Sequence, residues 1–373
     1  MSGRLSNRRV LLGALAALLL LAAAGCGGSG SGEASDEEKA AEANAKVDEL
    51  IEKEGPLAGL GEASPPPSDA SQWDTDFSKH TVPLDEFESG GPPKDGIPAI
   101  DVPHFTRADD VDWVERREPV IELEIDGETR AYPIQILTWH EITNDEIRSV
   151  PVAVTFCPLC NTALAFDRRI DGRVLDFGTT GKLRDSDLVM YDRQTESWWQ
   201  QFTGEAVVGE LAGKELRQLR ARIVSWGEFR DAHPNALVLD RETGAVREYG
   251  TNPYAGYDSL DSSPLFATRN GDDDRLPPKE RVVYVEVGDE AFAIPFASLA
   301  KEQAIEIETD EGTLAVRWRP GVASALDDST VAGGRDVGAA NVLLDGEPFP
   351  FSEPFWFAVA AFRPDIEIVD RSN

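Results

Sequence analysis

Two cysteines in the middle of the chain have the spacing of a metal-binding or redox pair. Residues 156–161 read Phe-Cys-Pro-Leu-Cys-Asn and lie between two stretches of apolar, strand-forming residues. A Cys-Pro-x-Cys turn can point both sulfur atoms at one metal ion. Asn161 suits the left-handed backbone that commonly follows such a turn. The pattern therefore predicts a site for a thiophilic metal at Cys157 and Cys160.

A tetrahedral site needs two more ligands, and the chain contains no second CxxC motif to supply them. We expect His140 and Met190 to complete the site, and a thioether ligand would favour copper. Carboxylates in their place would favour zinc, so either copper or zinc is the expected cofactor. The carboxylate candidates are Glu141, Asp185, Asp187 and Asp192.

Two interpretations without a metal stay open at this point. In an oxidising compartment the cysteines can form a local disulfide, which closes only a tiny loop and stabilises little. A thioredoxin-like redox pair would open a helix, whereas residues 162–168 alternate like a strand. His140 and Met190 can equally be core residues with no ligand role.

The segment that follows, residues 177–200, is dense in glycine, hydroxyl and acidic side chains. Such a segment can line a ligand cleft, or it can simply cap a β-sheet. A hydrolase could use Ser186 or Ser197 with His140, but the chain lacks a G-x-S-x-G elbow. Whether the protein is an enzyme is left open. The ligand-binding candidates are Thr180, Ser186, Asp187, Asp192 and Gln200.

Short strand-like runs, separated by turn signals, make up most of the chain beyond residue 118. The Asp-Gly pairs at 126–127 and 171–172 predict hairpin turns. Residues 134–142 can form a short helix after a proline. We therefore expect an α+β fold that is rich in β-structure.

The sequence also predicts an internal duplication of a strand-hairpin and short-helix unit. Repeat 1 covers about residues 111–245, and a shorter repeat 2 covers about 275–373. Cys157 aligns with Arg319 and Cys160 with Val322, so only repeat 1 can carry the cysteine site. Identical residues at aligned positions include Glu118 and Glu280, Pro133 and Pro295, Leu137 and Leu299, Trp226 and Trp356, and Pro234 and Pro364.

The N-terminus has the pattern of a bacterial export signal. Three arginines precede an apolar run over residues 10–24, which is short for a spanning helix and typical of a signal peptide. The run ends at Cys26 in a lipobox-like stretch, which predicts a signal peptide over 1–25 and lipidation of Cys26. The Asn-Arg-Arg at residues 7–9 also resembles a twin-arginine signal, so the export route stays open. Residues 26–80 are predicted to be a tether, a helix and a Pro-rich linker.

Composition limits the partners that the protein can have. The chain has 373 residues, with 68 acidic against 36 basic side chains and a formal net charge of -32. The sequence has no basic stripe that could neutralise nucleic-acid phosphates, so we expect no nucleic-acid partner. The three cysteines are too few for a disulfide framework. The expected partner is the cell membrane, reached through the lipid on the extracytoplasmic face.

Four motifs together resemble a family of secreted or lipid-anchored bacterial and archaeal proteins that is catalogued as a domain of unknown function. The resemblance covers about residues 110–373, within a family domain placed at 81–373, and implies that His140, the two cysteines and the Met190 region form one unit. It implies no activity. Thr180 stands where the family resemblance leads us to expect serine, and Asp185 where asparagine is usual. The motifs are Trp-His-Glu-Ile-x-Asn-Asp at 139–145, Phe-Cys-Pro-Leu-Cys at 156–160, Asp-Leu-Val-Met-Tyr-Asp-Arg-Gln-Thr-Glu-Ser-x-Trp at 187–199, and Phe-Trp-Phe-Ala at 355–358.

The leading hypothesis is therefore a lipid-anchored extracytoplasmic protein that binds copper or zinc at its Cys-Pro-Leu-Cys site. The alternatives are a non-catalytic binding or structural lipoprotein with a local disulfide, a thiol-redox protein, and a hydrolase-like enzyme that uses the cleft between Thr180 and Ser197.

Overall fold

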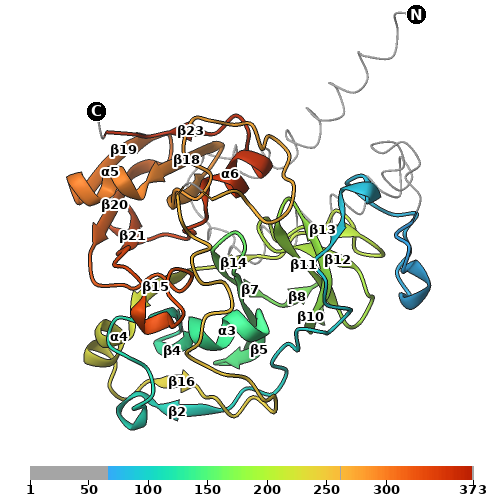
Figure 1. The fold of residues 1–373 in the computed structure, drawn as a ribbon, viewed down its shortest axis with the longest axis horizontal. Helices are drawn as coiled ribbons and strands as arrows, with labels where there is room; N and C mark the ends of the chain where they lie inside the picture. Colours follow the sequence, from blue (N-terminus) through green and yellow to red (C-terminus); the bar gives the residue numbers. More distant parts are fainter. Residues whose placement is uncertain (1–65, 261, 372–373) are drawn as a thin grey trace, which may run out of the picture.

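The computed structural model describes residues 66–260 and 262–371 (Figure 1). The fold is mostly β-sheet, with 39% of residues in strands and 13% in helices, arranged as a five-bladed β-propeller. The expected α+β fold built from a duplicated hairpin and helix unit is therefore wrong. The described part of the chain has four α-helices of only seven residues each, too short to form a layer. Turns and prolines in the sequence predict where such short helices lie, but they do not predict what fraction of the chain is helical.

The first two sheets are built around hairpins of the N-terminal half, which lie at the bottom and centre of Figure 1. The order of each sheet is given by hydrogen-bonded neighbours. The first sheet is β15 (Ala221–Ser225), β3 (Pro119–Ile125), β4 (Glu128–Pro133), β16 (Leu237–Leu239) and β2 (Phe105–Arg107). The second is β14 (Gln218–Leu219), β7 (Thr162–Asp167), β6 (Val150–Cys157) and β5 (Ile142–Ile147).

The third sheet lies on the right of Figure 1, and the last two are the orange and red sheets at its upper left. The third is β1 (Glu88–Ser89), β10 (Phe177–Arg184), β11 (Asp187–Asp192), β12 (Trp198–Gln200) and β13 (Ala206–Val208). The fourth is β17 (Val282–Val287), β18 (Glu290–Pro295) and β23 (Glu367–Ile368). The fifth is β19 (Ala304–Thr309), β20 (Gly312–Arg319), β21 (Ala339–Leu344) and β22 (Glu347–Pro348).

Short helices and a small ribbon connect these sheets. Proline precedes both α3 and α5, and its fixed φ and missing N–H are tolerated at a helix start. Ser225 caps α4 by accepting a hydrogen bond from the Glu228 backbone N–H. The elements are α3 (Ile134–His140), α4 (Trp226–Ala232), α5 (Phe296–Glu302), α6 (Trp356–Phe362), and the ribbon β8 (Arg169–Ile170) and β9 (Arg173–Val174), with 3-10 turns at Ala70–Gln72, Leu84–Glu86, Ala108–Asp110 and Val331–Gly333.

The fourth sheet pairs its strands in the same way as part of the first sheet, and the fifth pairs its strands in the same way as the second. In the first sheet β4 pairs in parallel with β16, and in the fourth sheet β18 pairs in parallel with β23. Likewise β7 pairs with β14, and β21 pairs with β22. Among the described residues of the second half the third sheet has no counterpart, because β21 and β22 are joined by a two-residue turn where β7 and β14 enclose β8 to β13. The third sheet thus adds side chains to the first half that the second half lacks.

Packing begins before the position expected for the globular part. Trp73 is 7% exposed, and its ring lies edge-on to the rings of Tyr191 and Trp198, with centroids 5.2 and 5.1 Å away. The last residues assigned to the linker over 26–80 therefore pack on the third sheet. The predicted signal peptide, the lipidation site at Cys26, the tether, the predicted helix and the linker up to residue 65 lie outside the described residues.

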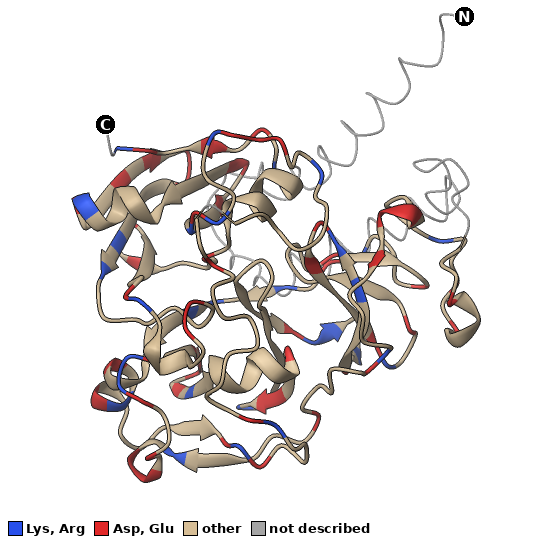
Figure 2. Ribbon diagram, viewed as in Figure 1, with Lys and Arg blue, Asp and Glu red and all other residues tan. Residues whose placement is uncertain are grey.

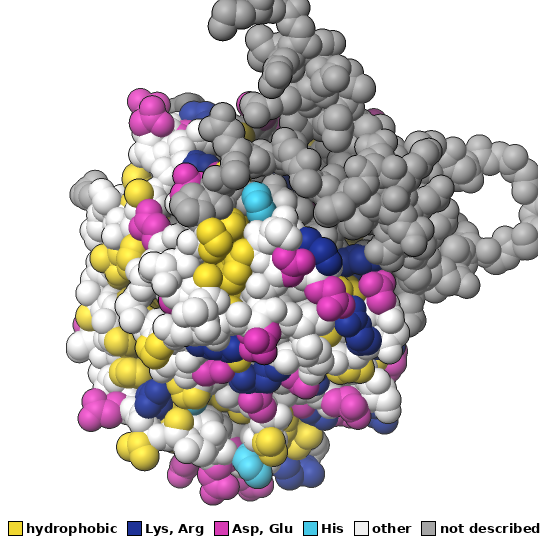
Figure 3. All heavy atoms as spheres, turned by 90° about the vertical axis from the view of Figure 1, so that its right-hand side faces the viewer, with side chains coloured by type: hydrophobic (Ala, Val, Ile, Leu, Met, Phe, Trp, Pro, Cys, Tyr) yellow, Lys and Arg dark blue, Asp and Glu magenta, His cyan; other side chains and the backbone are white. Residues whose placement is uncertain are grey.

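Charge is spread over the surface. Figure 2 shows acidic and basic residues distributed over loops and strands of every sheet. The described part of the face in Figure 3 carries acidic, basic and apolar side chains interspersed. Within residues 66–371, apart from position 261, the longest helices fall far short of a membrane span.

Candidate metal centre

The Cys-Pro-Leu-Cys segment is the tight turn between β6 and β7. Cys157 is the last residue of β6, and it pairs directly with Thr162, the first residue of β7. Asn161 has a φ of 59°, so it supplies the left-handed backbone that closes the turn. Its Nδ2 donates to the Glu353 carbonyl oxygen at 2.7 Å. A segment from the end of the chain therefore holds the turn in place.

The turn brings both thiols to the carboxylate of Asp187, the first residue of β11. One ligand atom from each of Cys157, Cys160 and Asp187 lies within 4.8 Å of the other two. The Cys160 Sγ donates to Asp187 Oδ1 at 2.9 Å. The three residues are 1% exposed or less, and both cysteines are free thiols. Two thiols and one carboxylate in a buried group form a set of ligands that can hold a metal ion.

Hydrogen bonds fix the orientation of the Asp187 carboxylate. Its Oδ2 accepts hydrogen bonds from Gln200 Nε2 at 2.5 Å and from the Phe202 backbone N–H at 2.9 Å. The Arg184 guanidinium in turn donates to Gln200 Oε1 at 3.3 Å. Such outer contacts orient a ligand before a metal arrives. The Oδ1 atom remains directed at the sulfur of Cys160.

Burial keeps the two thiols of the metal-free group protonated. It raises the pKa of the Cys157 thiol and raises that of Cys160 well above its ordinary value. Burial also raises the pKa of Asp187 to about 6. Since metal ligands must be deprotonated, an ion that enters this group has to displace the protons.

Two further ionisable side chains lie close to this group. Glu141 follows α3, and burial together with the negative charge of Asp187 raises its pKa to about 8. The Lys279 ammonium lies 2.8 Å from the centroid of the Tyr257 ring and donates to the Tyr257 carbonyl oxygen at 3.1 Å. Burial lowers the pKa of Lys279 to about 7, while the charges of Asp258 and Cys160 oppose that shift. A cation that interacts electrostatically with Cys160 can offset negative charge on the thiolates.

Comparison with known proteins identifies the family but no function. Residues 94–366 match the family described as protein of unknown function DUF3179. The chain belongs to the DUF3179 family. This confirms the expected membership of a family defined only as a domain of unknown function. No curated protein and no solved structure matches the chain significantly.

Two of the four predicted ligands of this DUF3179 chain, His140 and Met190, lie apart from the thiols and Asp187. The His140 ring nitrogens are occupied, with Nδ1 2.7 Å from the Pro98 carbonyl oxygen and Nε2 2.7 Å from the Tyr249 hydroxyl. Met190 is fully buried in the main hydrophobic core. It lies three residues after Asp187 on β11, and alternation along a strand places the two side chains on opposite faces. The third ligand of the group is Asp187, one of the carboxylate alternatives.

The other candidates of the polar segment mostly hold the backbone in place. Thr180 donates to the Val189 carbonyl oxygen at 2.5 Å, and Ser186 donates to the Phe266 carbonyl oxygen at 3.0 Å. Asp192 accepts from the indole N–H of Trp199 and from the backbone N–H of Thr195. Of the five ligand-binding candidates, the structure brings together only Asp187 and Gln200.

Lys279 and Tyr257 were missed by sequence reasoning. Both lie between the two predicted repeats or at the start of the second, far from the cysteines in the chain. Lys279 stands in the run Pro-Pro-Lys-Glu-Arg at 277–281, which gives no sign that its side chain is buried. Glu141 gave a stronger sequence signal, because it aligns with Gln303 in the second half. In the structure both residues follow a short helix and have a φ of 60°. The backbone is the same at the two positions, and only the first half carries a carboxyl group there.

Proposed function

We propose that this protein binds one zinc ion through Cys157, Cys160 and Asp187. The observation that carries the proposal is the burial of two thiols and one carboxylate within 4.8 Å of one another. Zinc is commonly bound by cysteine thiolates together with histidine or carboxylate ligands. Neighbouring side chains already orient the carboxylate, which supports a binding role beyond packing.

The ligand set favours zinc over copper. Copper(I) prefers soft thiolate and thioether ligands, whereas a carboxylate is a hard oxygen ligand. The thioether of Met190 lies on the face of β11 opposite to Asp187, so we do not include it as a soft third ligand. Two thiolates and one carboxylate carry three negative charges against two on the zinc ion. The nearby Lys279 ammonium is suited to offset the remaining charge.

Three protein ligands leave one position of a tetrahedron for water or another ligand, as in catalytic zinc sites. Glu141 is a buried carboxyl group near Asp187, and it forms no hydrogen bond or ion pair with any other residue in the described ranges. Because its pKa is about 8, Glu141 has to lose its own proton before it can accept one from a bound water molecule or serve as a fourth ligand.

A thiol-redox function is less well supported. The reactive form of cysteine is the thiolate, and redox cysteines have a lowered pKa and partial exposure. Here both sulfurs are buried and burial raises the pKa of both thiols. A local disulfide remains the competing state in an oxidising compartment.

The same proposal places the zinc site outside the cytoplasm. The signal-like sequence before Cys26 supports lipidation of that cysteine and attachment to the extracytoplasmic face of the cell membrane. Metabolic labelling with a radioactive fatty acid tests this part. Label in the wild type and none in Cys26→Ala supports it, and equal label in both contradicts it.

Cobalt substitution tests the metal site directly. Cobalt(II) added to metal-free protein should give an intense thiolate-to-cobalt charge-transfer band with tetrahedral ligand-field bands, and equimolar zinc should abolish them. Cys157→Ser and Cys160→Ser should each weaken the charge-transfer band. A spectrum no different from cobalt in buffer, with protein whose two thiols are verified as reduced, would exclude the site.

A further inference from the structure

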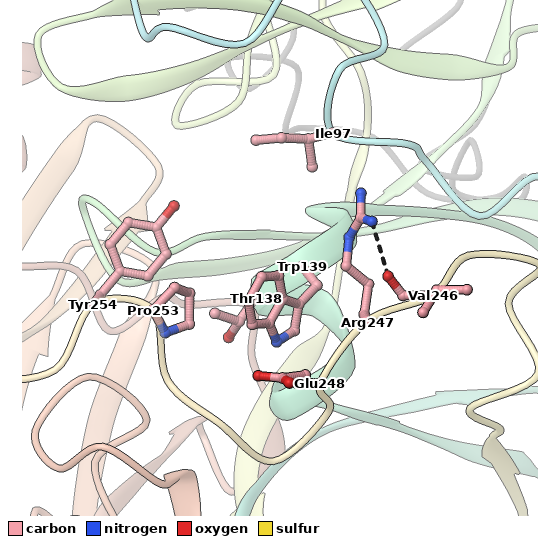
Figure 4. A pocket seen from close by; sticks show the side chains of 8 residues that line it. All are labelled: Ile97, Thr138, Trp139, Val246, Arg247, Glu248, Pro253 and Tyr254. Carbon is pink, nitrogen blue, oxygen red and sulfur yellow. Dashed lines mark hydrogen bonds between the residues drawn. The ribbon is translucent and has the colours of Figure 1, made fainter.

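A pocket of about 480 Å³ lies on the outer side of α3, formed by that helix and the loop after β16 (Figure 4). Its volume falls in the range of small-molecule sites. Trp139 and Thr138 come from the end of α3, and Arg247, Pro253 and Tyr254 come from the loop. The walls are mainly apolar and aromatic, with a few polar groups among them, as in sites for small organic ligands.

The pocket offers hydrogen-bond donors without protein partners. The Trp139 Nε1 is buried and has no hydrogen-bond partner among the described residues. The Tyr254 hydroxyl likewise forms no hydrogen bond with another side chain or carbonyl group in the described ranges. Burial raises the pKa of Tyr254, so its hydroxyl keeps its proton. A buried donor without a partner is costly unless a ligand or water satisfies it.

Arg247 supplies the charge that selects a ligand. Its guanidinium donates to the carbonyl oxygen of its neighbour Val246 at 3.1 Å, and it forms no ion pair with a carboxylate of residues 66–371 outside the gap at 261. In Figure 4 this guanidinium and the Tyr254 hydroxyl both point toward the Ile97 side of the pocket. The Glu248 carboxylate lies on the other side of Trp139 in that view. One end of the pocket is therefore cationic.

A second, larger pocket shows why an arginine in the lining is not sufficient to bind an anionic ligand. It is lined by three arginines and has a volume of about 630 Å³. Each of those guanidinium groups is already paired with a carboxylate of the protein, so none is free for a ligand. The pairs are Arg184 with Glu86, Arg269 with Asp185, and Arg363 with Glu286.

We propose that the pocket beside α3 binds a small planar carboxylate, with its ring on the aromatic walls and its carboxylate on Arg247. A charge-assisted bond to a guanidinium is among the stronger polar contacts in proteins. The flat apolar part of the ligand replaces water on Trp139 and Pro253.

Tyr254 connects this pocket to the neighbourhood of the metal group. Its hydroxyl is influenced electrostatically by Glu141 and Cys157, while its ring lines the pocket. Trp139 and Glu141 are likewise one residue apart on either side of His140. The proposal for the pocket does not require zinc to bind.

Calorimetric titration with benzoate tests the proposal, with neutral benzamide as the shape-matched probe. Benzoate should bind saturably to the full chain, and benzamide at least about tenfold more weakly. Arg247→Gln should weaken benzoate binding about tenfold, and Trp139→Phe should weaken it less because the aromatic wall remains. Arg173→Gln, which removes an exposed arginine on β9, is the matched control and should leave the affinity unchanged.

Each titration is run on both zinc-loaded and metal-free protein, so a failure of zinc to bind does not affect the result. The same Arg247 dependence in either form supports the pocket. Absence of saturable benzoate binding, equal affinity for benzamide, or wild-type affinity in a folded Arg247→Gln variant would each overturn the proposal. Thermal unfolding verifies that the variants are folded.

Discussion

The Cys160 thiol lies 2.9 Å from the Asp187 carboxylate, although 27 positions separate the two residues in the sequence. The contact exists because β11 of the third sheet begins beside the turn between β6 and β7. The third sheet has no counterpart in the part of the second half that the structure describes. The first half therefore gains both the cysteine turn and the carboxylate that completes the group.

Asp187→Asn should abolish high-affinity zinc binding with little loss of stability. The amide keeps the size of the side chain and can still accept one hydrogen bond from Gln200 or the Phe202 N–H, but it is a poor ligand for zinc. We expect affinity to fall at least about 100-fold, measured by competition with a zinc-binding dye. Asp185→Asn, which changes an acidic residue paired with Arg269, is the control and should retain zinc. Unchanged affinity in Asp187→Asn would remove this residue from the site.

Met190→Leu and His140→Gln should both keep one zinc per chain. The two residues are the ligands first suggested by the sequence, but Met190 lies on the face of β11 opposite to Asp187 and both His140 nitrogens have partners. Met190→Leu conserves volume and should cost less than about 1.5 kcal/mol of stability. Elemental analysis of the purified variants gives the answer. Loss of zinc from a folded Met190→Leu variant would mean that the thioether is a ligand.

Zinc affinity should rise steeply with pH. Both thiol pKa values are raised, so the thiols are protonated at neutral pH in the metal-free protein and must each release a proton on binding. Between pH 6.5 and 7.5, as two protons are displaced, the apparent affinity should increase by about 100-fold. Below about pH 6, where Asp187 also becomes protonated, the dependence should steepen further. An affinity that does not change with pH would contradict thiolate ligation.

Glu141→Gln should make the metal-free protein less sensitive to pH. The pKa of Glu141 is about 8 in the folded state against an ordinary 4.5, so its stabilising contribution is complete below pH 4.5 and is lost as pH rises to 8. One such group changes the free energy of unfolding by up to about 1.4 kcal/mol per pH unit. Gln303 already occupies the aligned position with the same φ. Urea unfolding at pH 5, 6.5 and 8 in a chelator should show a shallower decline for the variant, and parallel profiles would contradict the burial of an ionisable group.

The backbone at Asn161 gives a separate test of the turn. Its φ of 59° is unfavourable for alanine but accessible to glycine. Both substitutions remove the hydrogen bond to the Glu353 carbonyl oxygen, so the difference between them isolates the backbone. We expect Asn161→Ala to be less stable than Asn161→Gly by about 1 kcal/mol in denaturant unfolding. Equal stabilities would mean that the turn relaxes.

The sequence predicted the local features that depend on neighbouring residues. The hairpin turn at Asp126 and Gly127, the short helix after Pro133 and the left-handed Asn161 are set by turn chemistry and proline geometry. The fold class was wrong because the share of strand depends on how short segments pair across the chain. No local pattern indicates that β16 joins β4 in parallel.

The same distinction applies to the site. The cysteine pair was recognisable from its spacing, and Asp187 was one of several acidic candidates. Choosing among them requires knowing which carboxylate faces the turn, and that depends on how the third sheet packs against the second. His140 was a candidate because histidine is a common metal ligand, but its ring nitrogens contact the Pro98 carbonyl oxygen and the Tyr249 hydroxyl instead.

The measurement that tests the zinc site most directly combines elemental analysis with mapping of the thiols. Full-length protein is purified without chelator, its metal content is determined, and Cys157 and Cys160 are alkylated under denaturing conditions and identified by mass spectrometry. We predict one zinc per chain, both cysteines alkylated without prior reduction, and loss of zinc in Cys157→Ser. A chain with no metal whose two cysteines are alkylated only after reduction would contradict the zinc site and show a disulfide in its place.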